Sequence, residues 1–173
     1  MKMQRDKVVL VDVYDHSIGE LEKLEAHRQG MLHRAFSVFV LNDRRELLLQ
    51  QRADHKYHGG GLWTNTCCSH PQWSENVGEA ARRRLLYEMG MECDLKFSHS
   101  FIYRAEVEND LIEHEFDHVF VGYSNSDPVI NPLEVKDYKW VPLEQIISDF
   151  VEFPELYTYW FKMALPGVIS RGV

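Results

Sequence analysis

The chain has 173 residues, a length typical of one domain with a substantial core. Hydrophobic residues make up 45% of it and charged residues 27%, as in ordinary globular proteins. The formal net charge is −8, and nonspecific binding to nucleic acid or anionic membranes needs an excess of lysine and arginine instead. We therefore expect a single domain over residues 1–173, with no nucleic-acid partner and room for a local basic pocket.

Membrane and secretory signals are not recognisable in the sequence. No apolar run approaches the roughly 20 residues that span a bilayer, and the apolar segment near the start soon meets Asp12 and Asp15. The cysteines Cys67, Cys68 and Cys93 are odd in number and two are adjacent, which argues against a disulfide framework. We expect a cytoplasmic protein with free thiols and no membrane partner.

Strand-like and helix-like segments follow one another along the chain. Aromatic and β-branched runs predict strands, and Asn42-Asp43 predicts a hairpin turn between the second and third. The predicted strands are 7–13, 35–41, 46–52, 97–105, 112–123 and 135–141. The predicted helices are a short turn at 21–27, then 77–89, then one from Pro142 towards Phe150, and one after Pro154 that carries Leu156, Trp160 and Met163. This order predicts an α/β (α+β) fold with a mixed sheet.

Glu113 and Glu115 form the densest chemical signal. Side chains alternate along a strand, so both glutamates face one side, and we expect Ile112, Phe116 and Phe120 to face the core on the other. Two carboxylates in one cavity repel each other unless a cation lies between them. A divalent-metal site is one interpretation, and a solvent-facing pair of acids is the other.

Three histidines could complete such a metal site. His27 and His33 flank a short loop, and His70 follows Cys68 closely. Two carboxylates and three imidazoles form a mixed shell suited to Mn²⁺, Mg²⁺ or Zn²⁺. Five other histidines have ordinary interpretations as surface, hydrogen-bonded or structural residues: His16, His55, His58, His99 and His118.

The segment Cys67-Cys68-Ser69-His70-Pro71 lies between a loop of three glycines and the helix 77–89. A thiol beside a metal-binding histidine and near a helix N-terminus should have a lowered pKa. The alternative is a pair of small buried hydrophobes. We expect that alternative for Cys67, and the local sequence leaves both open for Cys68.

Three cations could neutralise a phosphate group in this acidic protein. Arg52 offers a bidentate fork, and Lys23 and Lys56 offer point charges. Each of them alone is more typical of a solvated surface residue, so a binding role depends on other signs of a phosphate ligand.

Such a sign comes from a family resemblance. The segment RADHKYHGGGLWTNTCCSHP, residues 52–71, resembles the type 1 isopentenyl-diphosphate isomerases, above all in W-T-N-x-x-C-x-H-P. Y-R-A at 103–105 and E-x-E from Glu113 follow in the family's order, and His27 and His33 extend the match to most of the chain. The resemblance implies the family's modified Nudix fold, with a mixed sheet sandwiched by helices.

The helix 77–89 then corresponds to a degenerate Nudix box. The hydrolytic pattern is G-x5-E-x7-R-E-U-x-E-E-x-G-U, in which U is aliphatic. Hydrolysis requires several carboxylates to hold metal ions against a diphosphate, and two of the three clustered glutamates are replaced here. Aligned on Gly90, the relevant positions are Ser69 for the first glycine, Glu75, Arg83, Arg84, Tyr87 and Glu88.

The resemblance also implies roles for single residues. It implies a first metal, Mn²⁺ (or Zn²⁺ or Mg²⁺), held by His27, His33, His70, Glu113 and Glu115. It implies a second ion, Mg²⁺, held by Glu88, the substrate diphosphate and the backbone carbonyl of Cys68. For catalysis and substrate binding it implies Cys68 as the essential cysteine, Glu115 as the acid assisted by Tyr103, and Lys23, Arg52, Lys56 and Trp160 as substrate contacts.

The implied reaction converts isopentenyl diphosphate to dimethylallyl diphosphate. Cys68 and Glu115 would face opposite sides of the substrate, one donating and one accepting a proton, in an order that the sequence leaves open. Trp160 would stabilise the carbocation with its ring face. A Nudix hydrolase of a nucleoside diphosphate derivative and a noncatalytic ligand-binding module are the alternatives. We expect a monomer.

Overall fold

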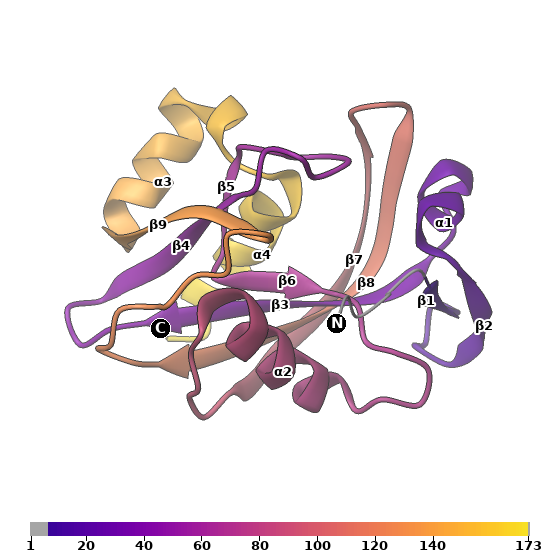
Figure 1. Ribbon diagram of the computed structural model, residues 1–173, viewed down its shortest axis with the longest axis horizontal. Coiled ribbons are helices and arrows are strands. Elements are labelled where there is room, and N and C mark those ends of the chain that lie inside the picture. Colours follow the sequence, from indigo (N-terminus) through magenta and orange to yellow (C-terminus); the bar gives the residue numbers. More distant parts are fainter. Residues whose placement is uncertain (1–6, 173) are drawn as a thin grey trace.

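The computed structural model describes residues 7–172, and Figure 1 shows its arrangement. In that part of the chain, strands of one mixed sheet are combined with four α-helices and a short 3₁₀ turn. The strands are β1 (Lys7–Val11), β2 (Ser17–Glu22), β3 (His33–Leu41), β4 (Glu46–Arg52), β5 (Trp63–Thr64), β6 (Cys67–Ser69), β7 (Lys96–Val107), β8 (Leu111–Tyr123) and β9 (Val135–Pro142). The helices are α1 (Lys23–Gln29), α2 (Val77–Met89), α3 (Leu143–Glu152) and α4 (Tyr159–Ile169), and the turn η1 spans Pro154–Leu156.

Strand β3 is the centre of the sheet. It pairs in parallel with β8 over nine residue pairs and antiparallel with β6. β7 and β8 form a long antiparallel hairpin, and β4 pairs antiparallel with β9 and with β5. The predicted α+β fold with a mixed sheet is confirmed, but the predicted hairpin of β3 with β4 is reduced to one pair, Leu41 with Leu47. The long partner of β4 is β9.

The two faces of the sheet carry separate hydrophobic cores. Alternate residues of β3, such as Phe36 and Val38, pack with α2, whereas Phe39 and Leu41 pack with α3 and α4. Figure 1 shows α2 on one side of the sheet and α3 and α4 on the other. All of β3 except Arg34 is buried, as expected for a central strand covered on both faces.

Local signals fix the bounds of α2 as the sequence predicts. The Asn76 side chain accepts a hydrogen bond from the Glu79 N–H at 3.1 Å, which satisfies one free amide of the first turn. Gly90 ends the helix at φ 61°, and a Cβ there would lie 2.5 Å from the Val129 carbonyl oxygen. Only glycine suits both constraints.

Other predicted bounds are corrected by the structure. The first strand ends at Val11. β2 takes up residues 17–20, where the sequence predicts no element, and the first two residues of the predicted helical turn 21–27, so α1 begins at Lys23. Leu156 lies in η1, before α4 begins at Tyr159. Ile112 and Phe116 are only half-buried, so the expected core position of that strand face is wrong for them. In the described part of the chain, no helix is long and apolar enough to cross a membrane.

Candidate active site

A cavity of about 310 Å³ lies where the first halves of β3 and β8, the end of β6 and the loop after β4 meet. Nine of the predicted site residues line it: Lys23, Arg52, Lys56, Cys68, His70, Glu88, Glu113, Glu115 and Trp160. Tyr103, His27 and His33 are buried immediately behind that lining, where they contact His70 or the glutamates. The structure therefore brings all the predicted residues to one place.

Glu115 is the centre of a polar cluster on one wall of this cavity. Its Oε1 lies 2.9 Å from His70 Nε2 and 3.5 Å from His33 Nε2, and Tyr103 donates its hydroxyl proton towards Oε2 at 2.7 Å. Burial alone would raise the pKa of Glu115, but its contacts with His33 and His70 hold it well below the ordinary value. Burial lowers the pKa of His70 to about 3. At neutral pH the carboxylate is therefore ionised and the His70 imidazole neutral, the forms that bind metals.

The donor atoms fit a divalent cation. His27, His33, His70 and Glu115 each offer one ligand atom, and these atoms all lie within 4.8 Å of one another. The Nδ1 of His27 donates to the Lys23 carbonyl at 2.7 Å, and that of His33 to the Met31 carbonyl at 2.8 Å. Both Nε2 atoms are buried without a hydrogen-bond partner. Backbone bonds at Nδ1 fix the tautomer that leaves Nε2 free for a metal, as is usual for histidine ligands.

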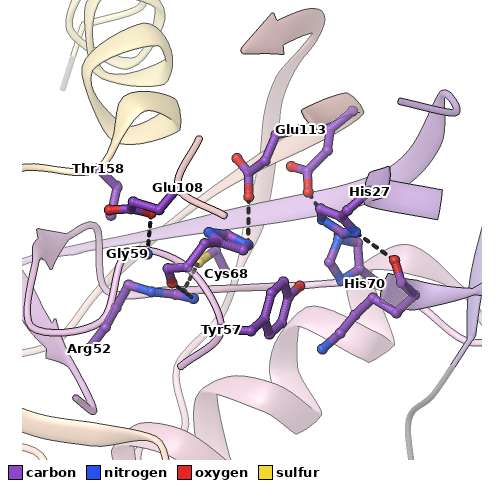
Figure 2. A network of polar contacts seen from close by, with 12 residues as sticks. His27, Arg52, Tyr57, Gly59, Cys68, His70, Glu108, Glu113 and Thr158 are labelled. Carbon is purple, nitrogen blue, oxygen red and sulfur yellow. Dashed lines mark hydrogen bonds and ion pairs between the residues drawn. The ribbon is translucent and has the colours of Figure 1, made fainter. Parts of the chain in front are cut away.

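Glu113 takes a different place from the other predicted ligands. Its Oε2 lies 2.9 Å from the Tyr103 hydroxyl, which also contacts Glu115. The potential metal-ligand atoms that lie close to its carboxylate, however, are those of His27 and His58. His58 Nε2 lies 3.0 Å from Glu113 Oε1, and both side chains are buried. In Figure 2 a dashed line runs down from the Glu113 carboxylate to mark this contact. His27 and His70 lie at one end of the network and Arg52 at the other.

Cys68 belongs to the site, and Cys67 does not. The two adjacent residues of β6 point to opposite faces of the sheet, so Cys67 is completely buried in the core beneath α2. Cys68 lines the cavity, and its Sγ lies 3.9 Å from Arg52 Nη1. Burial raises the pKa of the Cys68 thiol to about 12. The predicted lowering of this pKa is wrong for the protein without metal, because burial outweighs the nearby Arg52 charge.

The opposite wall of the cavity is strongly cationic. Lys23, Arg52 and Lys56 line it as predicted, together with Arg84. Burial, and then the charges of Lys56 and Arg52, lower the pKa of Lys23. Lys56 pairs with Glu134 and Arg84 with Glu88, so carboxylates already offset part of this positive charge. A polyanionic ligand would stabilise the cations further.

Comparisons with known proteins agree with this geometry. The NUDIX domain family matches residues 31–161. "Isopentenyl-diphosphate Delta-isomerase 2" of Aromatoleum aromaticum is 51% identical over 95% of this chain and 87% of its own length. The protein of the same name from Photorhabdus laumondii is also 51% identical, over 96% of this chain and 94% of its own. This chain belongs to the isopentenyl-diphosphate Delta-isomerase family.

Solved structures place this isomerase-family chain on the Nudix fold. A Deinococcus radiodurans protein of known crystal structure superimposes with a TM-score of 0.72, over 85% of this chain and 90% of its own, at 20% identity. Charged residues at the Nudix-box positions, in α2 and just before it, form ion pairs with one another. Arg83 Nη2 lies 2.6 Å from Glu75 Oε1, and Arg84 pairs with Glu88.

Sequence reasoning missed several polar residues of this isomerase-family site, among them His58, Arg84 and Glu134. The sequence alone indicates a surface or hydrogen-bonded position for His58, yet this residue is 5% exposed and lines the cavity. Arg84 and Glu134 also line it, with Arg84 Nη2 3.3 Å from Glu134 Oε2. The glycine loop that follows His58, where backbone can approach a ligand closely, was the one local signal that could have drawn attention to it.

Proposed function

We propose that this chain interconverts isopentenyl diphosphate and dimethylallyl diphosphate, the activity that its relatives' names describe. The observation that carries the proposal is the composition of one cavity. Cys68 and Glu115 line the same space, and Trp160 and four cations line it with them. A thiol, a carboxylate, an aromatic face and a cationic wall are what a proton-shifting reaction on a small diphosphate requires.

The first divalent ion, Mn²⁺ (or Zn²⁺ or Mg²⁺), would be held by His27, His33, His70, Glu113 and Glu115. The free Nε2 atoms of His27 and His33 support this assignment. When bound, the cation supplies positive charge that offsets the repulsion between the two glutamates and increases the acidity of groups bonded to them. The second ion, Mg²⁺, would be held by Glu88 and the carbonyl of Cys68 together with the substrate.

The chemistry is a proton added and a proton removed. A proton added to the terminal carbon of the isopentenyl double bond leaves a tertiary carbocation, and loss of a proton from the adjoining methylene forms the allylic double bond. We assign these two transfers to Cys68 and Glu115, one donating and the other accepting. Tyr103 assists, because its hydroxyl contacts both Glu113 and Glu115 and can move a proton between them.

The remaining walls bind and protect the substrate. Lys23, Arg52 and Lys56 would bind the diphosphate. The Arg52 guanidinium lies 5.1 Å from the centre of the Trp160 ring, so the diphosphate and hydrocarbon ends of the cavity are adjacent. The ring face of Trp160 would stabilise the carbocation by about 2 kcal/mol once water is excluded. We further propose that residues 1–173 form one domain that acts as a monomer in the cytoplasm.

The proposal is tested by incubating the purified protein with isopentenyl diphosphate, Mg²⁺ and Mn²⁺, and following the products by proton and phosphorus NMR. We expect the allylic isomer and no free phosphate or pyrophosphate. Cys68→Ala should abolish conversion. Cys67→Ala, its neighbour on the other face of the sheet, should retain it. Phosphate or pyrophosphate release without isomer would instead establish a Nudix hydrolase, and full activity of Cys68→Ala would refute the assigned role of the thiol.

A further inference from the structure

His58 is a buried polar residue of the site that the proposed reaction does not yet use. It lies in the loop between β4 and β5, twelve positions before His70 in the sequence. Its Nε2 lies 3.0 Å from Glu113 Oε1, whereas its Nδ1 is buried without a partner. An ionised carboxylate only accepts protons, so an attractive contact at this distance requires the proton to be on Nε2.

The backbone around His58 is held on both sides. The Gly59 N–H donates to Glu108 Oε2 at 2.9 Å, and Asn109 Nδ2 donates to the Tyr57 carbonyl at 2.9 Å. Both partners lie at the turn of the β7–β8 hairpin, the element that also carries Glu113. Arg52 Nη2 donates to the His58 carbonyl at 3.1 Å. These bonds hold the backbone that carries His58 against the hairpin that carries Glu113, and Figure 2 shows the contact of Gly59 with Glu108 among them.

The ring of His58 also contacts the apolar part of the cavity. It meets the Trp160 ring edge to face, with ring centres 5.7 Å apart and planes at 88°. His27, which is in the cluster around Glu115, lies 5.7 Å away on another side. His58 therefore touches a candidate metal carboxylate, a candidate metal imidazole and the aromatic wall at once.

We propose that His58 is a positioning residue of the metal centre, which holds Glu113 in the orientation that completes the first coordination shell. This inference rests on the proposed function, because it assumes that Glu113 is a metal ligand. Partners that hydrogen-bond a ligating carboxylate commonly contribute 10- to 100-fold in metal affinity, roughly the effect of orienting the ligand in advance. Direct ligation by His58 is a different arrangement. Its donor atom lies within 4.8 Å of those of His27 and Glu113, close enough for that arrangement, so the experiment below must distinguish the two.

The experiment measures Mn²⁺ binding to the full chain, stripped of metal, by the electron paramagnetic resonance signal of free Mn²⁺. We expect His58→Ala to weaken binding by about 10- to 100-fold. His58→Gln keeps an N–H near the position of Nε2 and should recover most of the loss. His16→Gln, an exposed histidine outside the lining of this cavity, is the control and should bind as the parent does.

The outcomes separate this inference from the proposed function. Binding to His58→Ala as tight as to the parent, or equal weakening in His58→Gln, would overturn the positioning role. Pulsed measurements count the nitrogens bound to Mn²⁺, and one fewer in His58→Gln than in the parent would show direct ligation and overturn it too. A parent protein that binds no Mn²⁺ would instead refute the metal centre itself, and with it the premise of the inference.

Discussion

Removing the Tyr103 hydroxyl isolates the contribution of one proton shared between two carboxylates. Tyr103 is 4% exposed, and its oxygen lies 2.7 Å from Glu115 Oε2 and 2.9 Å from Glu113 Oε2. Burial, with the two nearby glutamate charges, raises its pKa well above the ordinary value, so the hydroxyl stays protonated at any working pH. Tyr103→Phe keeps the buried ring and deletes only this donor.

The expected size of the effect follows from the charged acceptors. A hydrogen bond to a charged group contributes about 1.5–3 kcal/mol. If that stabilisation is needed while Glu115 exchanges its proton, the loss corresponds to a roughly 10- to 150-fold decrease in kcat. Because the hydroxyl has one proton, deletion should cost one such bond and not two. KM should change little, since Tyr103 lies behind the cavity wall and not on it.

The assay is steady-state conversion of isopentenyl diphosphate, with thermal unfolding of each variant measured in parallel. Tyr157→Phe is the control: this tyrosine is also buried and donates to a carboxylate, Asp149, at 2.6 Å, but it does not line the cavity. It should lose some stability and keep its kcat. A Tyr103→Phe variant with parental kcat, or a loss confined to stability, would refute the proposed proton relay.

Three further predictions concern metal, substrate and thiol. Chelation should lower Tm by roughly 5–11 °C relative to protein with Mn²⁺ at 100 times its Kd, because binding then adds about 2.7 kcal/mol to the free energy of unfolding. Scanning fluorimetry measures Tm, and an unchanged value would contradict a bound ion. Arg52→Lys keeps the charge but loses the bidentate guanidinium and its contact with Trp160, so kcat/KM should fall about tenfold or more. The control Arg44→Lys, at an exposed position, should leave kcat/KM unchanged. An unchanged kcat/KM for Arg52→Lys would exclude bidentate binding. Burial raises the pKa of Cys68 to about 12, so only about one part in 10,000 of this thiol is thiolate at pH 8. Alkylation of Cys68 by iodoacetamide in the metal-free protein should therefore keep accelerating as pH rises from 7 to 10. A rate that levels off below pH 9 would show a much more acidic thiol.

Local signals in the sequence were sufficient where the chain itself supplies the constraint. The bounds of α2 are set by Asn76 and Gly90, which cap it through neighbouring amides and a left-handed turn. Glu113 and Glu115 face one side of β8 because strand geometry requires it. The spacing of Cys68 and His70 belongs to a compact motif, and both residues line one cavity.

Long-range pairing determined what the sequence could not reveal. The parallel alignment of β3 with β8 places His33 opposite Glu115, but these residues are far apart in the chain and no local pattern predicts their register. β2 is mostly exposed and polar, so it lacks the apolar signal of a strand and is stabilised by pairing with β1. His58 was missed because its importance depends on the β7–β8 turn, to which its loop is bound.

Deuterium incorporation tests the central claim most directly. The protein is incubated with isopentenyl diphosphate in D₂O, and deuterium in the allylic product is located by NMR for the parent, Cys68→Ala and Glu115→Gln. We predict that the parent places solvent deuterium in a methyl group of the product, and that both folded variants lose this incorporation. Incorporation at the parental rate in either variant, or a parent that forms product with no solvent deuterium, would contradict a proton transfer carried by these two side chains.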